Sequence, residues 1–204
     1  MKSSANGKII IINGPSSSGK TTLALALQKL LNPPFLRFSF DVFLENNVLP
    51  MDLIKRDTSA WAAMRPAVFN GIHHCIPALA AAGNHIIFDH IIETQAWLDD
   101  LVRLLAEFDV FYVGLNCSIG ELERREMQRG NRRKGEARAD LESVHSFSPY
   151  DLDLNSEMPV ERNAQILIAE WENRKRPSAF DKMLERPLSC SPSREKNQIR
   201  NDTL

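Results

Sequence analysis

Residues 8–21 read KIIIINGPSSSGKT. Positions 9–12 are a continuous run of isoleucine, which is typical of a strand buried on both faces of a parallel sheet. Positions 14–21 then match the P-loop pattern GxxxxGK[ST] at every fixed position, and leucines at helical spacing follow over 23–31. A strand, a glycine-rich loop and a helix in this order favour a phosphate-binding loop over an ordinary glycine turn with an exposed lysine.

The spacing within this loop has a physical reason. Gly14 and Gly19 let the backbone curl so that its amide groups face phosphate oxygens, and the next helix adds the positive end of its dipole. In this motif Lys20 reaches the β and γ phosphates, and the hydroxyl of Thr21 can bind Mg²⁺. The residues that we expect to bind the nucleotide are Gly14, Pro15, Ser16, Ser17, Ser18, Gly19, Lys20, Thr21 and Thr22.

The rest of the chain alternates between strand and helix patterns. Further strands are predicted at 35–40, 85–88, 110–115 and 150–154, and helices at 59–82, 94–108, 118–128, 140–147 and 159–174. Five strand–helix units predict parallel strands joined by crossover helices, hence an α/β fold with a five-stranded parallel sheet. Residues 177–204 are rich in proline, serine and charge, so we expect one domain over 1–176 and a loose C-terminal tail after it.

The composition excludes several classes of protein. With 204 residues, 43% hydrophobic and 25% charged, the chain can build one sizeable core and is not disordered as a whole. A formal net charge of −1 argues against a nucleic-acid-binding or membrane-surface protein. No apolar run approaches the ~20 residues of a membrane helix, and three cysteines without CxxC spacing form no disulfide or zinc pattern. We therefore expect a cytoplasmic protein, and the sequence leaves its oligomeric state open, a homo-oligomer included.

Two aspartates stand at the predicted carboxyl ends of strands. Asp41 ends the second strand and Asp89 ends the third, and ligands of open α/β sheets bind beyond these strand ends. Both carboxylates should therefore share a crevice with the P-loop. Asp89 follows an apolar run, as the metal-binding acid of P-loop enzymes does, so Asp41 is left as the base that activates an acceptor hydroxyl. The alternative for either residue is that it caps the next helix.

A basic segment follows the fourth strand. Residues 124–138 contain seven lysines and arginines, and arginines that fold over a phosphoryl group in transfer stabilise its charge. Arg129 and Arg132 flank Gly130, so these two are the expected catalytic arginines of a lid over about 124–140. The alternative is a solvated helix face on which arginines pair with glutamates.

Together these motifs resemble the chloramphenicol phosphotransferase-like family of P-loop kinases. The resemblance rests on residues 8–21, the FSFD segment at 38–41 and the HIIFD strand at 85–89, and residues 113–117, 121–132, 144–145 and 150–151 are similar to later parts of the family. It implies a nucleoside-kinase-like three-layer α/β/α fold, with ATP and Mg²⁺ used to phosphorylate a hydroxyl of a small molecule. By this resemblance Asp41 matches the catalytic aspartate, Lys20 and Thr21 the phosphate and metal positions, and Arg129 and Arg132 the lid arginines.

The sequence also departs from the family pattern. Pro15 stands where a second glycine is common, His90 stands where a second acidic residue is expected, and residues 49–67 are shorter than in the antibiotic-modifying member. The acceptor is therefore open: a nucleoside, a sugar acid, adenylylsulfate or a nucleotide sugar are alternatives to the drug. A nucleotide-dependent switch is an alternative of another class, although the chain has no NKxD guanine-reading motif.

Overall fold

A five-stranded sheet forms the centre of the computed structural model, which describes residues 6–129, 135–147 and 149–186. All strand pairs are parallel, and the strand order is β2-β3-β1-β4-β5, so the predicted parallel architecture is confirmed. The strands are β1 (Ile9–Asn13), β2 (Phe35–Ser39), β3 (His85–His90), β4 (Val110–Asn116) and β5 (Leu152–Asn155).

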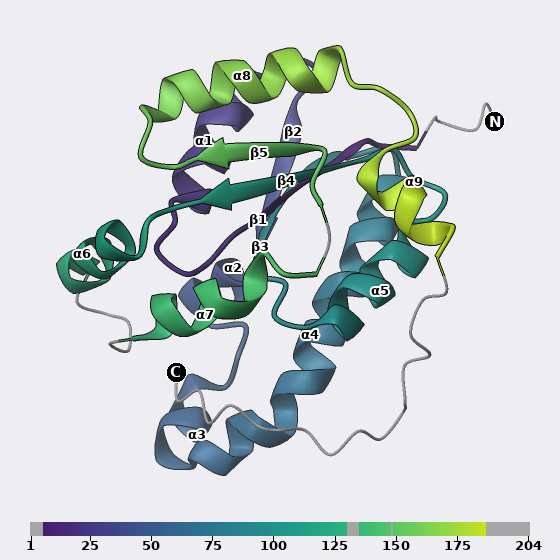
Figure 1. Cartoon of the computed structure of the whole chain (residues 1–204). Helices are drawn as coiled ribbons and strands as arrows, with labels where there is room; N and C mark the ends of the chain where they lie inside the picture. The colour runs from purple at the N-terminus through teal and green to yellow at the C-terminus, as the bar shows by residue number, and fades with distance from the viewer. Residues whose placement is uncertain (1–5, 130–134, 148, 187–204) are drawn as a thin grey trace.

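Helices connect the strands and cover both faces of the sheet (Figure 1). They are α1 (Lys20–Leu30), α2 (Asp41–Glu45), α3 (Met51–Arg56), α4 (Thr58–Ala81), α5 (Gln95–Leu104), α6 (Ile119–Arg129), α7 (Glu136–Val144), α8 (Val160–Glu172) and α9 (Ala179–Leu184). Figure 1 shows α1 and α8 on one side of the sheet, α4, α5 and α9 on the other, and α6 beyond the arrowheads of β4 and β5.

The isoleucine run of β1 supplies both layers of the core. Ile10 and Ile12 pack with apolar residues of α1 and α8, whereas Ile9 and Ile11 pack with those of α4, α5 and α9. All four side chains are fully buried, because successive residues of a central strand point to opposite faces and both faces are covered. This explains why the strand is apolar throughout and does not alternate with polar residues.

The position of the ligand site follows from the connections. The chain leaves β1 into α1 on one face of the sheet and leaves the neighbouring strand β3 into α5 on the other face. Where two adjacent strands send their connections to opposite faces, a crevice opens at their carboxyl ends. The loop at residues 14–19 begins at that point.

The structure differs from the sequence-based boundaries in two functional places. The second strand ends at Ser39, and Asp41 is the first residue of α2, so it lies in a helix directly after the strand and not within the strand. The loose tail expected from residue 177 is wrong for its first part, since Ala179, Phe180 and Met183 of α9 are buried in the core. Residues 187–204 lie outside the described chain.

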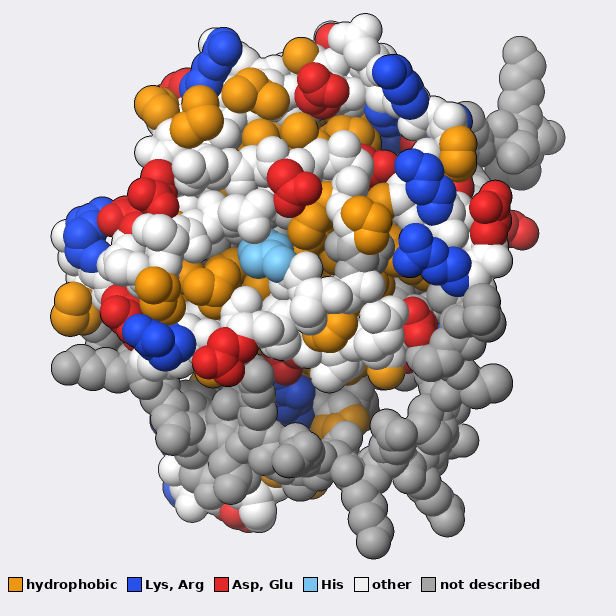
Figure 2. Space-filling view, viewed as in Figure 1, with side chains coloured by type: hydrophobic (Ala, Val, Ile, Leu, Met, Phe, Trp, Pro, Cys, Tyr) orange, Lys and Arg blue, Asp and Glu red, His pale blue; other side chains and the backbone are white. Residues whose placement is uncertain are grey.

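Charged side chains of both signs occur across the face of the molecule in Figure 2. Among the described residues, no helix has the length and apolar character needed to span a membrane.

Candidate active site

The P-loop is a tightly curled segment that leaves little room for side chains at its first glycine. A Cβ atom on Gly14 would lie 2.7 Å from the carbonyl oxygen of Leu115, so this position needs glycine for close approach. Gly19 adopts a φ of 94°, in the region that favours glycine, and Ser17 adopts a φ of 63° although it has a side chain. Such strained backbone persists where the surrounding structure holds it, and functional loops are a common place for it.

Lys20 lies inside the loop and not in bulk solvent. Its side chain is 8% exposed, and Nζ donates hydrogen bonds to the carbonyl oxygens of Gly14, at 2.9 Å, and Pro15, at 2.8 Å. Both contacts hold the ammonium group across the mouth of the curl. The predicted P-loop lysine is therefore placed where it can meet a phosphate bound by the loop.

Two buried hydroxyl groups of the loop have no hydrogen-bond partner among the described residues and suit the binding of a ligand. Ser17 is 4% exposed and Ser18 fully buried, and neither Oγ has a hydrogen-bond partner within the described chain. Buried hydroxyls almost always have a partner, because burying one without it costs roughly 1–3 kcal/mol. Ligand oxygens or ordered water at the loop would supply these partners.

The two predicted aspartates lie near each other and near the P-loop. In the sheet Asp89 pairs with Ile12 of β1 and Ser39 of β2, two residues from Gly14 and Asp41 respectively. Burial raises the pKa of the Asp89 carboxyl, the charge of Lys20 opposes that rise, and the charge of Asp41 adds to it. Lys20 of α1 and Asp41 of α2 thus both lie within electrostatic reach of the Asp89 carboxyl near the end of β3.

The oxygen donors at this point fit a magnesium ion. The Thr21 side chain lies close enough to Asp89 to lower the pKa of its carboxyl, and Asp41 brings a second carboxylate close by. Hydroxyl and carboxylate oxygens are the donors that Mg²⁺ prefers, with phosphate oxygens and water completing its shell. No group of three or more His, Cys, Asp or Glu side chains suited to a metal occurs in the described ranges, so two carboxylates and one hydroxyl are what this site offers.

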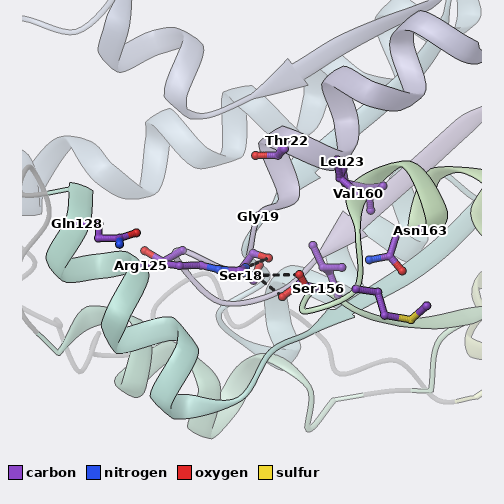
Figure 3. Close-up of a pocket in the computed structure, with 12 residues that line it drawn as sticks. Ser18, Gly19, Thr22, Leu23, Arg125, Gln128, Ser156, Val160 and Asn163 are labelled. Carbon is purple, nitrogen blue, oxygen red and sulfur yellow. Dashed lines mark hydrogen bonds between the residues drawn. The ribbon is translucent and has the colours of Figure 1, made fainter.

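A pocket of about 430 Å³ adjoins the loop. Figure 3 shows that it lies between the P-loop, α6 and the segment after β5, with Arg125 reaching across toward Ser18. The Arg125 guanidinium donates to the carbonyl oxygens of Ser18, at 3.1 Å, and Ser156, at 3.0 Å, and so closes one side of the pocket. The volume is within the ~300–1,000 Å³ of small-molecule sites. The lining residues are Ser17, Ser18, Gly19, Thr22, Leu23, Leu115, Arg125, Gln128, Ser156, Met158, Val160 and Asn163.

The predicted lid arginines remain predictions. Arg129 is the last residue of α6, and its side chain is not among those described. Arg132 lies within residues 130–134, outside the described chain. Two other arginines of this basic segment form ion pairs with a glutamate, as the alternative of a solvated helix face predicts: Arg124 and Arg125 both bind Glu121.

His90 belongs to the core and not to the crevice. Its ring is 3% exposed and stacks on Trp97, and its Nε2 lies 3.0 Å from Nε2 of His73. Since Asp89 and His90 are consecutive strand residues, their side chains point to opposite faces of the sheet. The same aromatic cluster contains Trp61 and Phe69, both buried, so their main role is packing.

Three residues near the site were not predicted as site residues. Arg37 of β2 forms an ion pair with Asp89 at 3.3 Å, and Arg125 touches the P-loop carbonyl as described. Asp140 of α7 accepts a hydrogen bond from the backbone amide of Ser16 at 2.9 Å. No local pattern distinguishes these side chains from other surface charges, because their contacts join segments 50 to 125 residues apart in the sequence.

Comparison with known proteins identifies the family. Residues 7–172 match the family described as chloramphenicol phosphotransferase-like protein. A curated Mycobacterium tuberculosis protein of strain H37Rv, named "Putative O-phosphotransferase", is 31% identical over 205 residues, which cover 90% of each chain. Its counterpart in strain CDC 1551 matches equally well.

Solved structures of P-loop kinases share the fold. An APS kinase of Mycobacterium tuberculosis, solved with AMPPNP and APS, superposes with a TM-score of 0.60 at 20% identity, covering 82% of this chain and 98% of that chain. A gluconokinase of Sinorhizobium meliloti gives a TM-score of 0.58 at 14% identity, covering 90% of this chain and 99% of that chain. A shikimate kinase of Bacteroides thetaiotaomicron superposes with a TM-score of 0.56 at 16% identity, covering 81% of this chain and 98% of that chain. The chain therefore belongs to the chloramphenicol phosphotransferase-like protein family and is a phosphotransferase with the fold of the P-loop kinases.

Proposed function

We propose that the chain transfers the γ-phosphoryl group of ATP to a hydroxyl of a small molecule, with Asp41 as the base. One observation carries the proposal: the P-loop lysine and the Asp41 carboxylate both act electrostatically on the Asp89 carboxylate, at the carboxyl ends of β1, β2 and β3. A phosphate nest beside an acceptor-side carboxylate is the arrangement that phosphoryl transfer to an alcohol requires.

The nucleotide half of the site is supported by the loop itself. The unpaired hydroxyls of Ser17 and Ser18 and the first-turn amides of α1 offer donors to phosphate oxygens. The 430 Å³ pocket next to Gly19 offers a mixed polar and apolar wall for the nucleoside part. When bound, ATP supplies the phosphoryl group, and Mg²⁺ neutralises charge on its oxygens. Thr21 and Asp89 are the residues that would hold the metal.

The acceptor half depends on Asp41. Its carboxylate accepts the proton of the acceptor hydroxyl as that oxygen bonds to the γ phosphorus, while the bond to the leaving ADP oxygen breaks. Lys20 stabilises the negative charge that spreads over the phosphoryl oxygens, and Arg129 and Arg132 are proposed to do so from the lid. Arg37 neutralises part of the charge of Asp89 and so lets two carboxylates lie in one crevice.

The experiment uses Asp41→Asn. This change keeps the size of the side chain and removes the base, so phosphoryl transfer should fall ~10²- to 10⁴-fold while binding of a non-hydrolysable ATP analogue stays within about threefold. Transfer is measured with labelled ATP against a panel of acceptors: chloramphenicol, nucleosides, sugar acids, adenylylsulfate and nucleotide sugars.

Glu45→Gln is the matched control, because Glu45 is an exposed carboxylate at the other end of the same helix. It should leave transfer unchanged. Unchanged turnover in Asp41→Asn would remove Asp41 from the mechanism, and turnover of ATP that is independent of any acceptor would favour the switch alternative.

The same proposal includes the bounds of the domain and of its lid and the compartment in which the reaction takes place. We place the catalytic domain over residues 1–176, extended in the fold by α9. The lid proposed over about 124–140 shares its last residues with α7, which a hydrogen bond to Asp140 holds against the P-loop. The free thiols of Cys75 and Cys117 suit a reducing compartment, which supports the cytoplasm as the place of the reaction.

A further inference from the structure

A side chain from outside the motif contacts the P-loop backbone. The amide of Ser16 donates a hydrogen bond of 2.9 Å to Oδ2 of Asp140, and Ser16 and Asp140 are only 2% and 7% exposed. P-loop amides ordinarily face phosphate oxygens. A carboxylate that binds one of them from another helix is therefore either part of the scaffold of the loop or a competitor of the phosphate.

The helix that carries Asp140 is fixed at both ends. At its start, the buried carboxylate of Glu126 accepts hydrogen bonds from the amides of Gly135, at 2.8 Å, and Ala137, at 3.0 Å. At its end, the carbonyl oxygen of Val144 accepts hydrogen bonds from Asn13 Nδ2, at 3.0 Å, and from a tyrosine hydroxyl. A helix held in this way does not move freely away from the loop, which favours a scaffold.

Two of these contacts reach the same part of the loop. Ala137, Asp140 and Val144 are buried and are spaced by three and four residues, so they share one face of α7. Asp140 contacts Ser16, and the Val144 carbonyl contacts Asn13, the residue directly before the loop. One helix face thus holds the first limb of the P-loop, residues 13–17, at two points.

This limb needs such support. Pro15 has no amide hydrogen, and its carbonyl oxygen and that of Gly14 bind Lys20. Ser17, the next residue after Ser16, has the strained φ of 63°. If the acceptor at Asp140 were absent, the buried Ser16 amide would lose its partner, and the limb would be free to relax.

We propose that Asp140 is a positioning residue, which holds the Ser16 amide and the first limb of the P-loop in the conformation that binds the nucleotide. This rests on the proposed function, since it concerns the ATP half of the same site. The hydrogen bond persists when the nucleotide binds, and the acceptor oxygen matters more than the negative charge.

The experiment compares variants of Asp140 by titration of the full chain with a non-hydrolysable ATP analogue and Mg²⁺. Asp140→Ala removes the acceptor and should weaken binding about tenfold. Asp140→Asn keeps an acceptor oxygen at the same place and should bind within about threefold of wild type. Glu142→Ala, an exposed position on the same helix, is the matched control and should not change binding.

A fourth variant separates geometry from charge. Asp140→Glu keeps the charge and moves the oxygens by one methylene group, so it should bind the ATP analogue more weakly than Asp140→Asn. This comparison tests the proposal even if Asp140→Ala does not fold. A merely structural role would lower the unfolding temperature of the variants and leave the dissociation constant of the folded protein unchanged.

The outcomes decide the proposal. Equal or tighter binding by Asp140→Ala would overturn it, because a carboxylate that competes with phosphate predicts tighter binding. Equal loss in Asp140→Asn and Asp140→Ala would overturn it too, because the charge and not the acceptor would then be responsible. Failure of the wild-type chain to bind the analogue would overturn the proposed function together with this inference, whereas wild-type binding with an indifferent Asp140 overturns this inference alone.

Discussion

Lys20 shows how one residue connects the loop to its function. A buried ammonium group needs partners, and Lys20 finds them in two carbonyl oxygens of its own loop, Gly14 and Pro15. These bonds hold the lysine at the site and can be exchanged for stronger bonds to phosphate, because charged acceptors bind an ammonium more strongly than carbonyls do.

Replacing this lysine tests the loop directly. Lys20→Met keeps most of the length of the side chain and removes the charge, so affinity for the ATP analogue should fall at least about tenfold. Isothermal titration measures the loss. Lys29→Met, on the exposed end of the same helix, should bind like wild type, and an equal loss in both variants would contradict the assignment of Lys20.

At the residue scale, the sequence predicted those residues of the candidate site that belong to a local motif or a strand end. Lys20, Thr21 and Asp89 were predicted because the P-loop has fixed spacing and because an acid follows an apolar strand. Asp140 and Arg125 were not predicted as site residues, because each acts through a backbone group of the P-loop more than 100 residues away. Only the tertiary structure brings those atoms together.

At the scale of elements, α4 and β3 share a pair of buried histidines. Burial lowers the pKa of His73 to about 4 and lowers that of His90 well below its usual 6.5, so both rings are neutral in the folded chain at neutral pH. In the unfolded chain both take up a proton once the pH falls below about 6.5. The fold therefore loses stability as the pH falls from about 6.5 toward 4.

The loss of stability at low pH can be measured. Because burial lowers the pKa of both rings, the free energy of unfolding should fall between pH 7 and pH 5. Urea unfolding at the two pH values measures the slope. His73→Gln should flatten it, whereas His74→Gln, at the exposed neighbour, should keep it. A wild-type slope in His73→Gln would show that the histidine pair is not its source.

The elements also show where sequence patterns fail. The strand and helix periods were strong enough to place all five strands, since buried strands and amphipathic helices have distinct periods. The short helix α9 was missed, because six residues carry little periodicity. Its burial depends on tertiary partners: the amide of Ala179 donates to the Asp151 carboxylate, and Asp109 binds Arg174 and Arg176.

At the scale of the molecule, the centre of the sheet and the P-loop are joined through one network. Asn13 donates to the hydroxyls of Tyr112 and Tyr150 and accepts from the amide of Ile92. It thereby links β1 to β4 and to the segments after β3 and before β5. The network fixes the position of Asn13, the residue after which the P-loop begins.

A substitution at Gly114 of β4 tests the packing of Tyr150, which belongs to this network. A Cβ atom there would lie 2.4 and 2.5 Å from ring atoms of Tyr150, so Gly114→Ala should destabilise the chain by about 1–3 kcal/mol in urea unfolding. Gly120 in α6 has no atom within 4 Å of such a Cβ, so Gly120→Ala should leave stability unchanged or raise it by up to about 1 kcal/mol. Equal effects of the two substitutions would contradict the close packing of Tyr150 on β4.

The most direct measurement is a crystal structure of the chain with Mg²⁺ and a non-hydrolysable ATP analogue. We expect the phosphates on residues 14–21, Nζ of Lys20 turned from the loop carbonyls to a phosphate oxygen, and the Asp41 carboxylate opening onto the γ phosphate. Phosphates bound elsewhere, or an Asp41 side chain directed away from them, would contradict the account.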